Sequence, residues 1–420
     1  KSPILILIDF CLKNQHKLTI INDPIYGFIT IPKGVIFDLI EHPYFQRLRR
    51  ISQMGMSYLV YPGAHHTRFH HALGCLYIMD KALQVLKSKG VEISHEEHEA
   101  AMIAILLHDI GHGPFSHAME HSIVENIHHE QISLQFMEAL NEEFNGSLTL
   151  GINIFKGVYQ RTFFNQLVSG QLDMDRTDYL KRDSFYTGMA EGNINTDRIL
   201  AMLNVKDDKL VVEEKGVYTI EKFLVARRLM YWQVYLHKTS LVAEQVLVRV
   251  LKRAKELSSM GVDLKGSSAL KFFLTEQITE STFNDKALGI FASLDDYDII
   301  SAMKEWVHHE DFVLRTLSEI IIYRRLLQIK IKKKPFSEEF IEQQINKVID
   351  HCNISREEAL YFVFGGTISN QAYTFKKQGI DILTRKGKVV DVVAASDQLS
   401  LKALSKEVIK NYICYPKYKD

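Results

Sequence analysis

The most informative segment of the chain is LLHDIGHGPFSH, which runs from Leu106 to His117. It places His108 and Asp109 side by side at the end of an apolar segment, and His112 follows one turn later. Imidazoles and carboxylates packed this densely are costly to bury unless something neutralises or coordinates them. Twelve of the 18 histidines fall between positions 65 and 129. Neutral imidazole and carboxylate together suit borderline divalent metals, so the cluster predicts a metal site.

The residues around this stretch predict a helix that ends at the metal site. EEHEAAMIAILLHDI (Glu96–Ile110) has helical composition, and two glycines and a proline follow it. Neighbours on a helix point about 100° apart, so other segments must supply the remaining ligands. RFHHALG offers His70 or His71, and GQLDMDRTDYLKRD offers Asp173 or Asp175. By composition alone, either member of each pair fits.

Composition points to a cytoplasmic protein. Among the 420 residues, Lys plus Arg and Asp plus Glu are both 51, so charge favours neither nucleic acid nor anionic membranes as partners. The four cysteines are scattered without a CxxC pair, which fits a reducing compartment and argues against a disulfide framework. The apolar run PILILI (Pro3–Ile8) is too short to span a membrane.

Hydrophobic patterning predicts a mainly α-helical chain in three units: residues 1–259 as the core, 260–335 as a helical extension, and 336–420 as a small α+β lobe. KLTIINDPIYGFITI (residues 17–31) and KLVVEEKGVYTI (residues 209–220) predict β-hairpins. A last helix is expected near residues 401–411. The basic run at residues 330–334 fits either a site for phosphate or nucleic acid or solvated charge at a sheet edge, and we favour the second interpretation.

Seven sequence words occur in the same order as in a known family: NDPIYGFI, FQRLRRISQMG, YPGAHHTRFHHALG, HDIGHGPFSH, HHEQIS, DMDRTDYLKRD and QVYLHK. They span roughly residues 18–240, and the order H…HD…D resembles the HD-domain metal-dependent phosphohydrolases. Within that superfamily the words resemble the deoxynucleoside triphosphate (dNTP) triphosphohydrolases, without their SAM domain. The resemblance implies a helical HD-domain core and one divalent metal, which we expect to be Mg, Mn, Fe, Ni or Zn. The implied metal ligands are His71, His108, Asp109 and Asp175.

The same resemblance implies hydrolysis of dNTPs to deoxynucleoside and tripolyphosphate. His117 would be the general acid, with Glu120 orienting it and His112 and His129 completing the catalytic set. The implied phosphate contacts are Arg68, Arg176 and Arg227; the mammalian member has Lys where this chain has Arg176. The implied sugar and base contacts are Gln53, Tyr179, Asp183, Tyr231 and Tyr235, although an aromatic stripe at helical spacing is usually core packing.

A nucleotide activator that drives assembly of a homo-oligomer, a tetramer or a dimer, is also implied. The positions matching its contacts are Asn22, Glu41, Gln46, Arg49, Arg198, Lys215, His237 and Lys238. Thr19 and Glu213 stand where the mammalian member has basic residues, which removes positive charge from this second site.

Two alternatives compete with the dNTP triphosphohydrolase. The first is an HD phosphohydrolase acting on nucleoside monophosphates or cyclic nucleotides, which needs fewer cations than three arginines. The second is a binding protein without catalysis, which an intact ligand set and a balanced charge do not favour.

Overall fold

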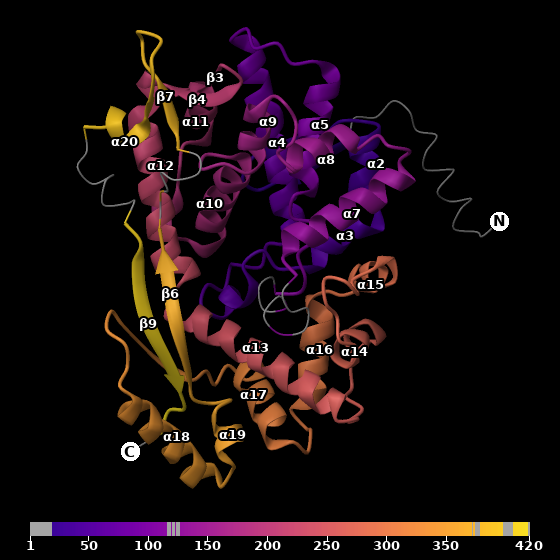
Figure 1. Cartoon of the computed structure of the whole chain (residues 1–420), viewed down its shortest axis with the longest axis vertical. Coiled ribbons are helices and arrows are strands. Elements are labelled where there is room, and N and C mark those ends of the chain that lie inside the picture. Colours follow the sequence, from indigo (N-terminus) through magenta and orange to yellow (C-terminus); the bar gives the residue numbers. More distant parts are fainter. Residues whose placement is uncertain are drawn as a thin grey trace, which may run out of the picture.

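The computed structural model describes residues 19–115, 119, 122, 127–371, 373, 379–397 and 406–418. Helices dominate, and the predicted mainly α-helical fold is confirmed (Figure 1). The N-terminal helices are α2 (Val35–Glu41), α3 (Pro43–Gln46), α4 (Arg68–Ser88), α5 (His95–Leu107), α7 (His129–Glu143), α8 (Thr149–Phe155), α9 (Thr162–Val168), α10 (Met174–Thr187), α11 (Thr196–Met202), α12 (Val217–Met230) and α13 (Lys238–Ser259).

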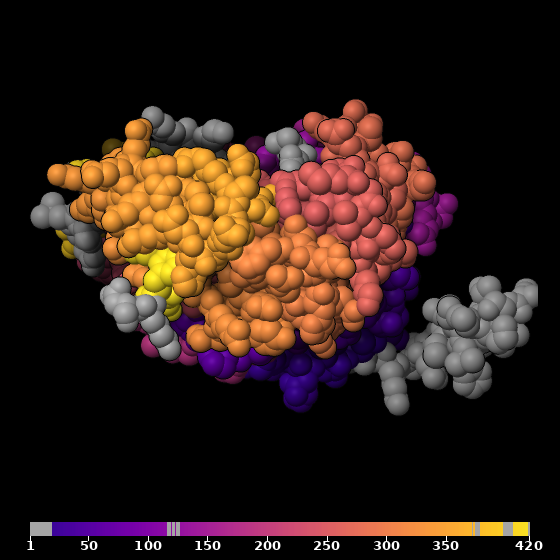
Figure 2. Space-filling view, turned by 90° about the horizontal axis from the view of Figure 1, so that it is seen from below, coloured from indigo at the N-terminus to yellow at the C-terminus, as the bar shows by residue number. Residues whose placement is uncertain are grey.

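Shorter helices and turns complete the chain. They are α14 (Ser268–Thr275), α15 (Asp285–Phe291), α16 (Asp296–Trp306), α17 (Phe312–Ile322), α18 (Glu338–Cys352), α19 (Arg356–Ala359) and α20 (Val392–Ala395), with the 3₁₀ turns η1 (Arg47–Arg50), η2 (Gly55–Leu59), η3 (Ala190–Gly192) and η4 (Glu214–Gly216) and the π-helical turn η5 (Tyr231–Tyr235). Seen from below, the segment after α13 covers this end of the molecule (Figure 2).

The central helix α5 shows why the HD stretch lies inside the protein. Ser94 caps its start and forms a capping box with Glu97. From Ala100 to Leu107 every residue is buried, so this half of the helix is apolar on all sides and packs within the core. His108 follows directly at its end.

The first predicted hairpin is confirmed. Strands β1 (Thr19–Asp23) and β2 (Gly27–Ile31) pair antiparallel, with Thr19 opposite Ile31. Asp23 closes the turn, because its carboxylate accepts from the backbone N–H groups of Ile25 and Tyr26.

The second predicted hairpin, residues 209–220, is wrong in its second half. Strand β4 (Lys209–Glu213) pairs with the preceding β3 (Leu203–Lys206), and α12 begins at Val217. The sheet order is β3-β4-β7-β8, where β7 (Asp381–Leu383) and β8 (Val389–Asp391) come from the C-terminal region.

The C-terminal region forms a second sheet in the order β5-β9-β6. Its strands are β5 (Gln328–Lys332), β6 (Phe364–Asn370) and β9 (Val408–Tyr415). The helix expected near residues 401–411 is therefore wrong from residue 408 onward, and residues 401–405 lie outside the described residues. Strands β7 and β9 pair with β4 and β5, which precede residue 336, and β8 joins the first sheet through β7. The division into three units stays a prediction.

Among the described helices, none is both long and apolar enough to cross a lipid bilayer.

Candidate metal centre and substrate cavity

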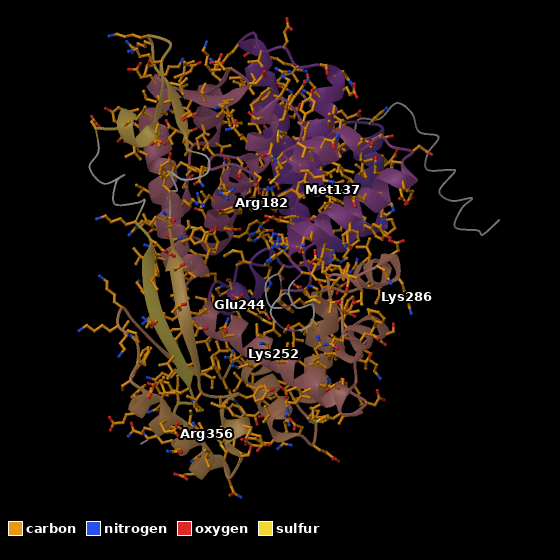
Figure 3. All side chains as sticks on the ribbon, in the orientation of Figure 1. Met137, Arg182, Glu244, Lys252, Lys286 and Arg356 are labelled. Carbon is orange, nitrogen blue, oxygen red and sulfur yellow. The ribbon has the colours of Figure 1, made fainter. Side chains whose placement is uncertain are left out.

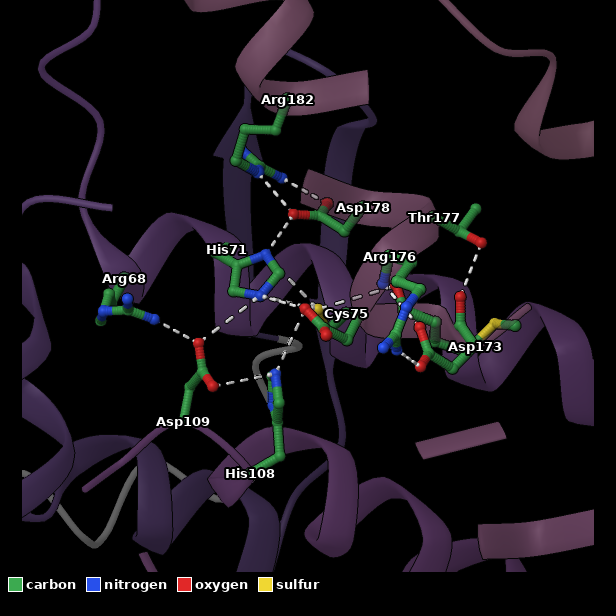
Figure 4. A network of polar contacts seen from close by, with 12 residues as sticks. Arg68, His71, Cys75, His108, Asp109, Asp173, Arg176, Thr177, Asp178 and Arg182 are labelled. Atoms are coloured by element: carbon green, nitrogen blue, oxygen red, sulfur yellow. Dashed lines mark hydrogen bonds and ion pairs between the residues drawn. The ribbon is translucent and has the colours of Figure 1, made fainter. Parts of the chain in front are cut away.

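Three helices bring the candidate metal ligands together (Figure 4). The first turn of α4 carries His71, the end of α5 is followed by His108 and Asp109, and the first turn of α10 carries Asp175. Segments 37 and 66 residues apart in sequence thus meet at one point, with Arg182 nearby in the middle of the molecule (Figure 3).

The donor atoms of these four residues lie close together. The Nε2 atom of His71 is 3.1 Å from Oδ1 of Asp175 and 3.9 Å from Oδ2 of Asp109. The Nε2 atom of His108 is 3.6 Å from Oδ1 of Asp175 and 3.5 Å from Oδ1 of Asp109. Ligands at about 2.0–2.2 Å from one ion, as around zinc, are separated by similar distances.

The chemistry of this group fits a divalent metal. The Nε2 atom of His108 is buried and has no hydrogen-bond partner, although it faces two carboxylates. Such an atom is costly unless a ligand completes it. Two imidazoles and two carboxylates are also the donor mixture that such an ion prefers.

Two other groupings of possible ligands overlap this centre: His71 with Cys75 and His108, and Asp109 with His112 and His129. Burial raises the pKa of the Cys75 thiol, so it stays protonated and is a poor ligand. The protonation of the thiol therefore favours the carboxylates as ligands.

The two choices left open by composition differ in their surroundings. Asp173 caps α10, accepting from the backbone N–H of Arg176 at 2.7 Å and that of Gly170 at 2.9 Å. The Nδ1 atom of His70 accepts from the N–H of Thr67 at 3.2 Å, in the cap of α4. Asp175 and His71 face each other instead, and we keep them as the proposed ligands.

A second layer of polar groups holds His71 and His108. The Nδ1 atom of His71 lies 2.7 Å from Oδ2 of Asp178, and the Nδ1 atom of His108 lies 2.7 Å from the carbonyl of Ile105. Arg182 binds Asp178 through Nε at 2.9 Å and Asp23 of the hairpin turn through Nη1 at 2.8 Å. Both rings are thereby oriented with Nε2 toward the centre.

The carboxylates of the centre are held ionised. Burial raises the pKa of Asp109, but His108, His112 and Arg68 outweigh it and hold the pKa well below its usual range. Burial likewise raises the pKa of Asp175, and His108 and His71 outweigh it. Both groups are therefore anionic at neutral pH and available to a cation.

A cavity of about 650 Å³ opens beside this centre. It is lined by many of the predicted residues: Gln53, Arg68, Asp109, His112, His129, Asp175, Arg176, Tyr179, Asp183, Tyr231 and Tyr235. Its size suits a small organic ligand of nucleotide dimensions, within the usual range of about 300–1,000 Å³.

The aromatic wall of the cavity comes from η5. In this π-helical turn the N–H of Leu236 donates to the carbonyl of Tyr231 at 2.8 Å. The hydroxyl of Tyr235 donates to Oδ2 of Asp183 at 2.8 Å, and His66 holds the other oxygen at 2.7 Å. Tyr179 meets Tyr235 edge to face at 5.9 Å. A π turn inside a helix is often found at a functional site.

The predicted catalytic set is only partly described. The rings of His112 and His129 stack with their centroids 3.9 Å apart, and both line the cavity. His117 and Glu120 lie outside the described residues.

The three arginines predicted to bind phosphate differ in placement. Arg68 is paired with Asp109, and Arg176 with Asp173, and both line the cavity. Arg227 is buried, donates to Gln171 at 3.2 Å, and is not among the lining residues.

The residues predicted to bind an activator form separate surface groups. Asn22 and Glu41 are exposed, and Arg49 donates to Gln46 at 2.7 Å. Arg198 donates to the carbonyl of Lys215 at 3.3 Å. His237 caps the start of α13, and Lys238 is the first residue of that helix. Among the described residues, no hydrogen bond or ion pair joins the group near Arg49 to the group near Lys215. Lys215 is paired at 2.8 Å with Glu213, one of the two departures from the family.

Sequence reasoning missed part of the cavity wall. Helix α13 contributes Ser240, Glu244 and Gln245, and η2 contributes Met56 and Ser57. The Oγ atom of Ser240 is buried without a hydrogen-bond partner. Nothing in the sequence sets these residues apart, since α13 has an ordinary amphipathic pattern.

Comparison with known proteins identifies the family. Residues 68–183 match the HD domain and residues 194–264 the HD associated region. The uncharacterized protein YwfO of Bacillus subtilis is 30% identical over 388 residues, covering 89% of this chain and 86% of that protein. A deoxynucleoside triphosphate triphosphohydrolase SAMHD1 homolog of Dictyostelium discoideum is 29% identical over 276 residues, covering 61% of this chain and 53% of that protein.

A solved structure is similar over nearly the whole chain. The crystal structure of a phosphohydrolase from Bacteroides thetaiotaomicron has a TM-score of 0.93 at 51% sequence identity, covering 96% of this chain and 100% of that one. The matched HD domain also contains all four candidate metal ligands. The chain therefore belongs to the HD-domain family of phosphohydrolases, with an HD-associated region after its HD domain.

Proposed function

We propose that this phosphohydrolase cleaves dNTPs to a deoxynucleoside and tripolyphosphate. The observation that carries the proposal is the single cavity of about 650 Å³ that joins the candidate metal carboxylates to two arginines and to a tyrosine–aspartate wall. The SAMHD1 proteins of Dictyostelium and cattle, which are 29% and 26% identical, are named deoxynucleoside triphosphate triphosphohydrolases.

The cations favour a polyphosphate over a monophosphate. Arg68 and Arg176 line the cavity beside Asp109 and Asp175, and a guanidinium offers a rigid fork of donors to phosphate oxygens. A divalent metal held by His71, His108, Asp109 and Asp175 would supply a Lewis acid at the phosphate and make water a stronger acid.

The tyrosine wall favours a deoxyribose. Tyr235 is fixed by its hydrogen bond to Asp183 and stands edge to face with Tyr179. A ring held in this way against C2′ leaves no room for a hydroxyl there, so a ribonucleotide is excluded by a clash.

The reaction requires attack by water on the α-phosphorus and cleavage of the bond between phosphorus and the 5′-oxygen. The leaving 5′-oxygen takes a proton, and a histidine serves this best near neutral pH. Family resemblance assigns that role to His117; His112, in the cavity wall, is the next candidate. We further propose a homo-oligomer that responds to a nucleotide activator.

The test is product analysis. The metal-stripped protein is loaded in turn with Mg, Mn, Fe(II), Ni or Zn and incubated with each dNTP, each ribonucleoside triphosphate, a nucleoside monophosphate and a cyclic nucleotide. We expect tripolyphosphate and deoxynucleoside from dNTPs alone. The control is the double variant His108→Ala/Asp109→Ala, which should fold but lose both bound metal and turnover. Turnover of the monophosphate or the cyclic nucleotide in place of dNTPs would support the alternative HD phosphohydrolase.

A further inference from the structure

One buried arginine forms hydrogen bonds with the loop of residues 110–115, which follows α5. Arg47 of η1 is completely buried. Its Nη1 donates to the carbonyl of Ile110 at 3.2 Å and its Nη2 to the carbonyl of His112 at 2.6 Å. Its Nε donates to the carbonyl of Leu294 at 3.1 Å. One guanidinium thus ties the loop to a segment 180 residues further along the chain.

The arginine has no direct carboxylate partner among the described contacts. Its guanidinium lies over the rings of Phe136 and Phe291, at 5.7 and 4.9 Å from their centroids. Burial lowers its pKa to about 9, so it remains charged at neutral pH. Replacing a buried ionic group by an apolar side chain of similar volume often leaves the folding stability of a protein unchanged. What the arginine adds is three directed hydrogen bonds to backbone carbonyls.

The far end of the same loop is held by an aspartate. Oδ1 of Asp296, the first residue of α16, accepts from the N–H of Phe115 at 2.8 Å, and its Oδ2 accepts from the N–H of Ser52 at 2.8 Å. Phe115 has φ = 50°, in the left-handed region that a side chain of this size rarely adopts. Such a conformation persists only where the surroundings impose it.

Residues of this loop, and Asp109 directly before it, face the cavity. Asp109 and His112 line it, and so does Phe115. The Nε2 atom of His112 is 3.4 Å from Oδ1 of Asp109, so the position of the loop backbone sets where the His112 ring stands relative to the candidate metal ligand.

We propose that Arg47 and Asp296 are positioning residues for hydrolysis, which hold the loop of residues 110–115 so that His112 faces the phosphate of the substrate. They act through the loop and touch no substrate themselves. This inference rests on the proposed phosphohydrolase function and adds to it the residues that align its catalytic loop.

The test compares Arg47→Met and Asp296→Asn with a matched control. Methionine fills much of the arginine's volume but donates nothing, and Asn keeps the shape of Asp296 while losing its charge. Arg50→Met is the control, because Arg50 leaves the same turn to pair with Asp295 and makes no contact with the loop. Metal content, kcat and KM are measured with the dNTP that the parent turns over best.

We expect both variants to bind metal at the parent's stoichiometry, with kcat lowered by about tenfold or more, the scale of a misplaced catalytic group, and KM changed less than threefold. Arg47→Lys should recover part of the loss. In a His112→Ala background, Arg47→Met should cost less than a further twofold, because residues acting as one unit are not additive. A parental kcat in both variants, or losses that multiply with His112→Ala, would overturn the proposal.

Hydrogen exchange separates this inference from the proposed substrate. In the metal-loaded protein without nucleotide, amides of residues 110–115 should exchange faster in Arg47→Met and Asp296→Asn than in the parent and in Arg50→Met. Unchanged exchange rates in residues 110–115 would show that Arg47 and Asp296 do not hold the loop in place. If the parent hydrolyses no dNTP, the proposed function fails while this measurement still decides the positioning role.

Discussion

Asp178 shows how a residue outside the cavity can govern the metal. It does not line the cavity. Its carboxylate nevertheless forms a hydrogen bond with Nδ1 of His71, and Arg182 donates to both of its oxygens. A carboxylate behind a metal-binding imidazole fixes its tautomer and raises its basicity.

Asp178→Asn should therefore weaken metal binding by about 10- to 100-fold, the usual effect of such a partner. Competition against a chelator of known affinity measures it. Asp80→Asn is the matched control, because Asp80, on α4, likewise pairs with a histidine, His98, at 2.9 Å but lies outside the candidate metal centre. Equal affinity in Asp178→Asn and the control would show that His71 needs no such support.

Tyr235 carries the second prediction at this scale. Tyr235→Ala should raise turnover of ribonucleotides relative to dNTPs by tenfold or more, whereas Tyr235→Phe should keep the discrimination, because the ring and not the hydroxyl meets C2′. The ratio of kcat/KM for each pair of nucleotides reports the result. Tyr231→Ala serves as the control on the same π turn. If Tyr235→Ala still discriminates against ribonucleotides as the parent does, this tyrosine has only a packing role.

Local words in the sequence were enough to suggest candidate residues, but not their partners. His108, Asp109 and His112 are read from one short segment. The contacts that hold that segment come from Arg47 and Asp296, about 60 residues before it and 180 after it. A single sequence gives no signal that such distant residues meet.

A largely buried ion pair joins helix α13 to the start of helix α17. Arg253 donates to Asp311 through Nη2 at 2.6 Å and Nε at 3.2 Å, with side chains 16% and 13% exposed. Asp311 also caps α17 by accepting from the N–H of Leu314 at 2.7 Å. Burial raises the pKa of Asp311, but Arg253 and this backbone bond outweigh it and lower the pKa below its usual value.

Asp311→Asn should lower the free energy of unfolding at pH 7 by about 1–2 kcal/mol, the scale of a charge-assisted hydrogen bond, since Asn still caps a helix. The folded-state pKa is depressed, so the stabilisation is present above the unfolded pKa of about 3.9 and is lost as pH falls through the folded value. Denaturant unfolding of parent and variant should therefore converge below about pH 4.

Asp263→Asn is the control for this pair. Asp263 binds Lys271 at 2.6 Å but is 87% exposed, and such pairs contribute about 0–1 kcal/mol. A loss in Asp263→Asn equal to that in Asp311→Asn would show that the ion pair between α13 and α17 has no special weight.

The errors in predicted elements have local causes. The Lys215–Gly216 pair resembles a hairpin turn, but Gly216 has φ = −90° and leads into α12. The actual turn between β3 and β4 uses Asp207 and Asp208, with φ of 52° and 54°, which is the backbone of a tight hairpin. For β9, the composition of Val408–Tyr415 suits a strand, yet its partners lie 38 residues or more away in sequence.

Across the whole molecule, none of the residues expected to bind an activator lines the cavity beside the candidate metal ligands. Gln46 and His237 are half-buried, and the others are exposed. Arg49 lies with its guanidinium 3.6 Å from the ring centroid of Phe69 and donates to Gln46. This places a preformed cation at the surface of η1. Coupling requires a nucleotide to bind the assembled state more tightly than the free subunit.

Added guanine or deoxyadenine nucleotide should raise both the mass and the rate of the parent, and Arg49→Ala should need at least tenfold more nucleotide for the same response. Light scattering and initial rates measure this. Arg356→Ala is the control, because this exposed arginine is the first residue of α19, near the lower end of the molecule (Figure 3), and pairs with Glu342. If no nucleotide changes mass or rate in the parent, the regulatory proposal fails and the catalytic one stands.

The position of β9 has a consequence for folding during synthesis on the ribosome. This strand is central in its sheet, with β5 on one side and β6 on the other, yet it is synthesised after both. About 76 residues separate the end of β5 from the start of β9, which at ~5–20 residues per second leaves β5 waiting for about 4–15 seconds. An unpaired strand edge recruits other chains during such a delay. The lysines of β5, Lys330 and Lys332, with Lys333 and Lys334 directly after it, place repelling charge on that edge, and so guard the nascent chain against aggregation until its partner strand emerges.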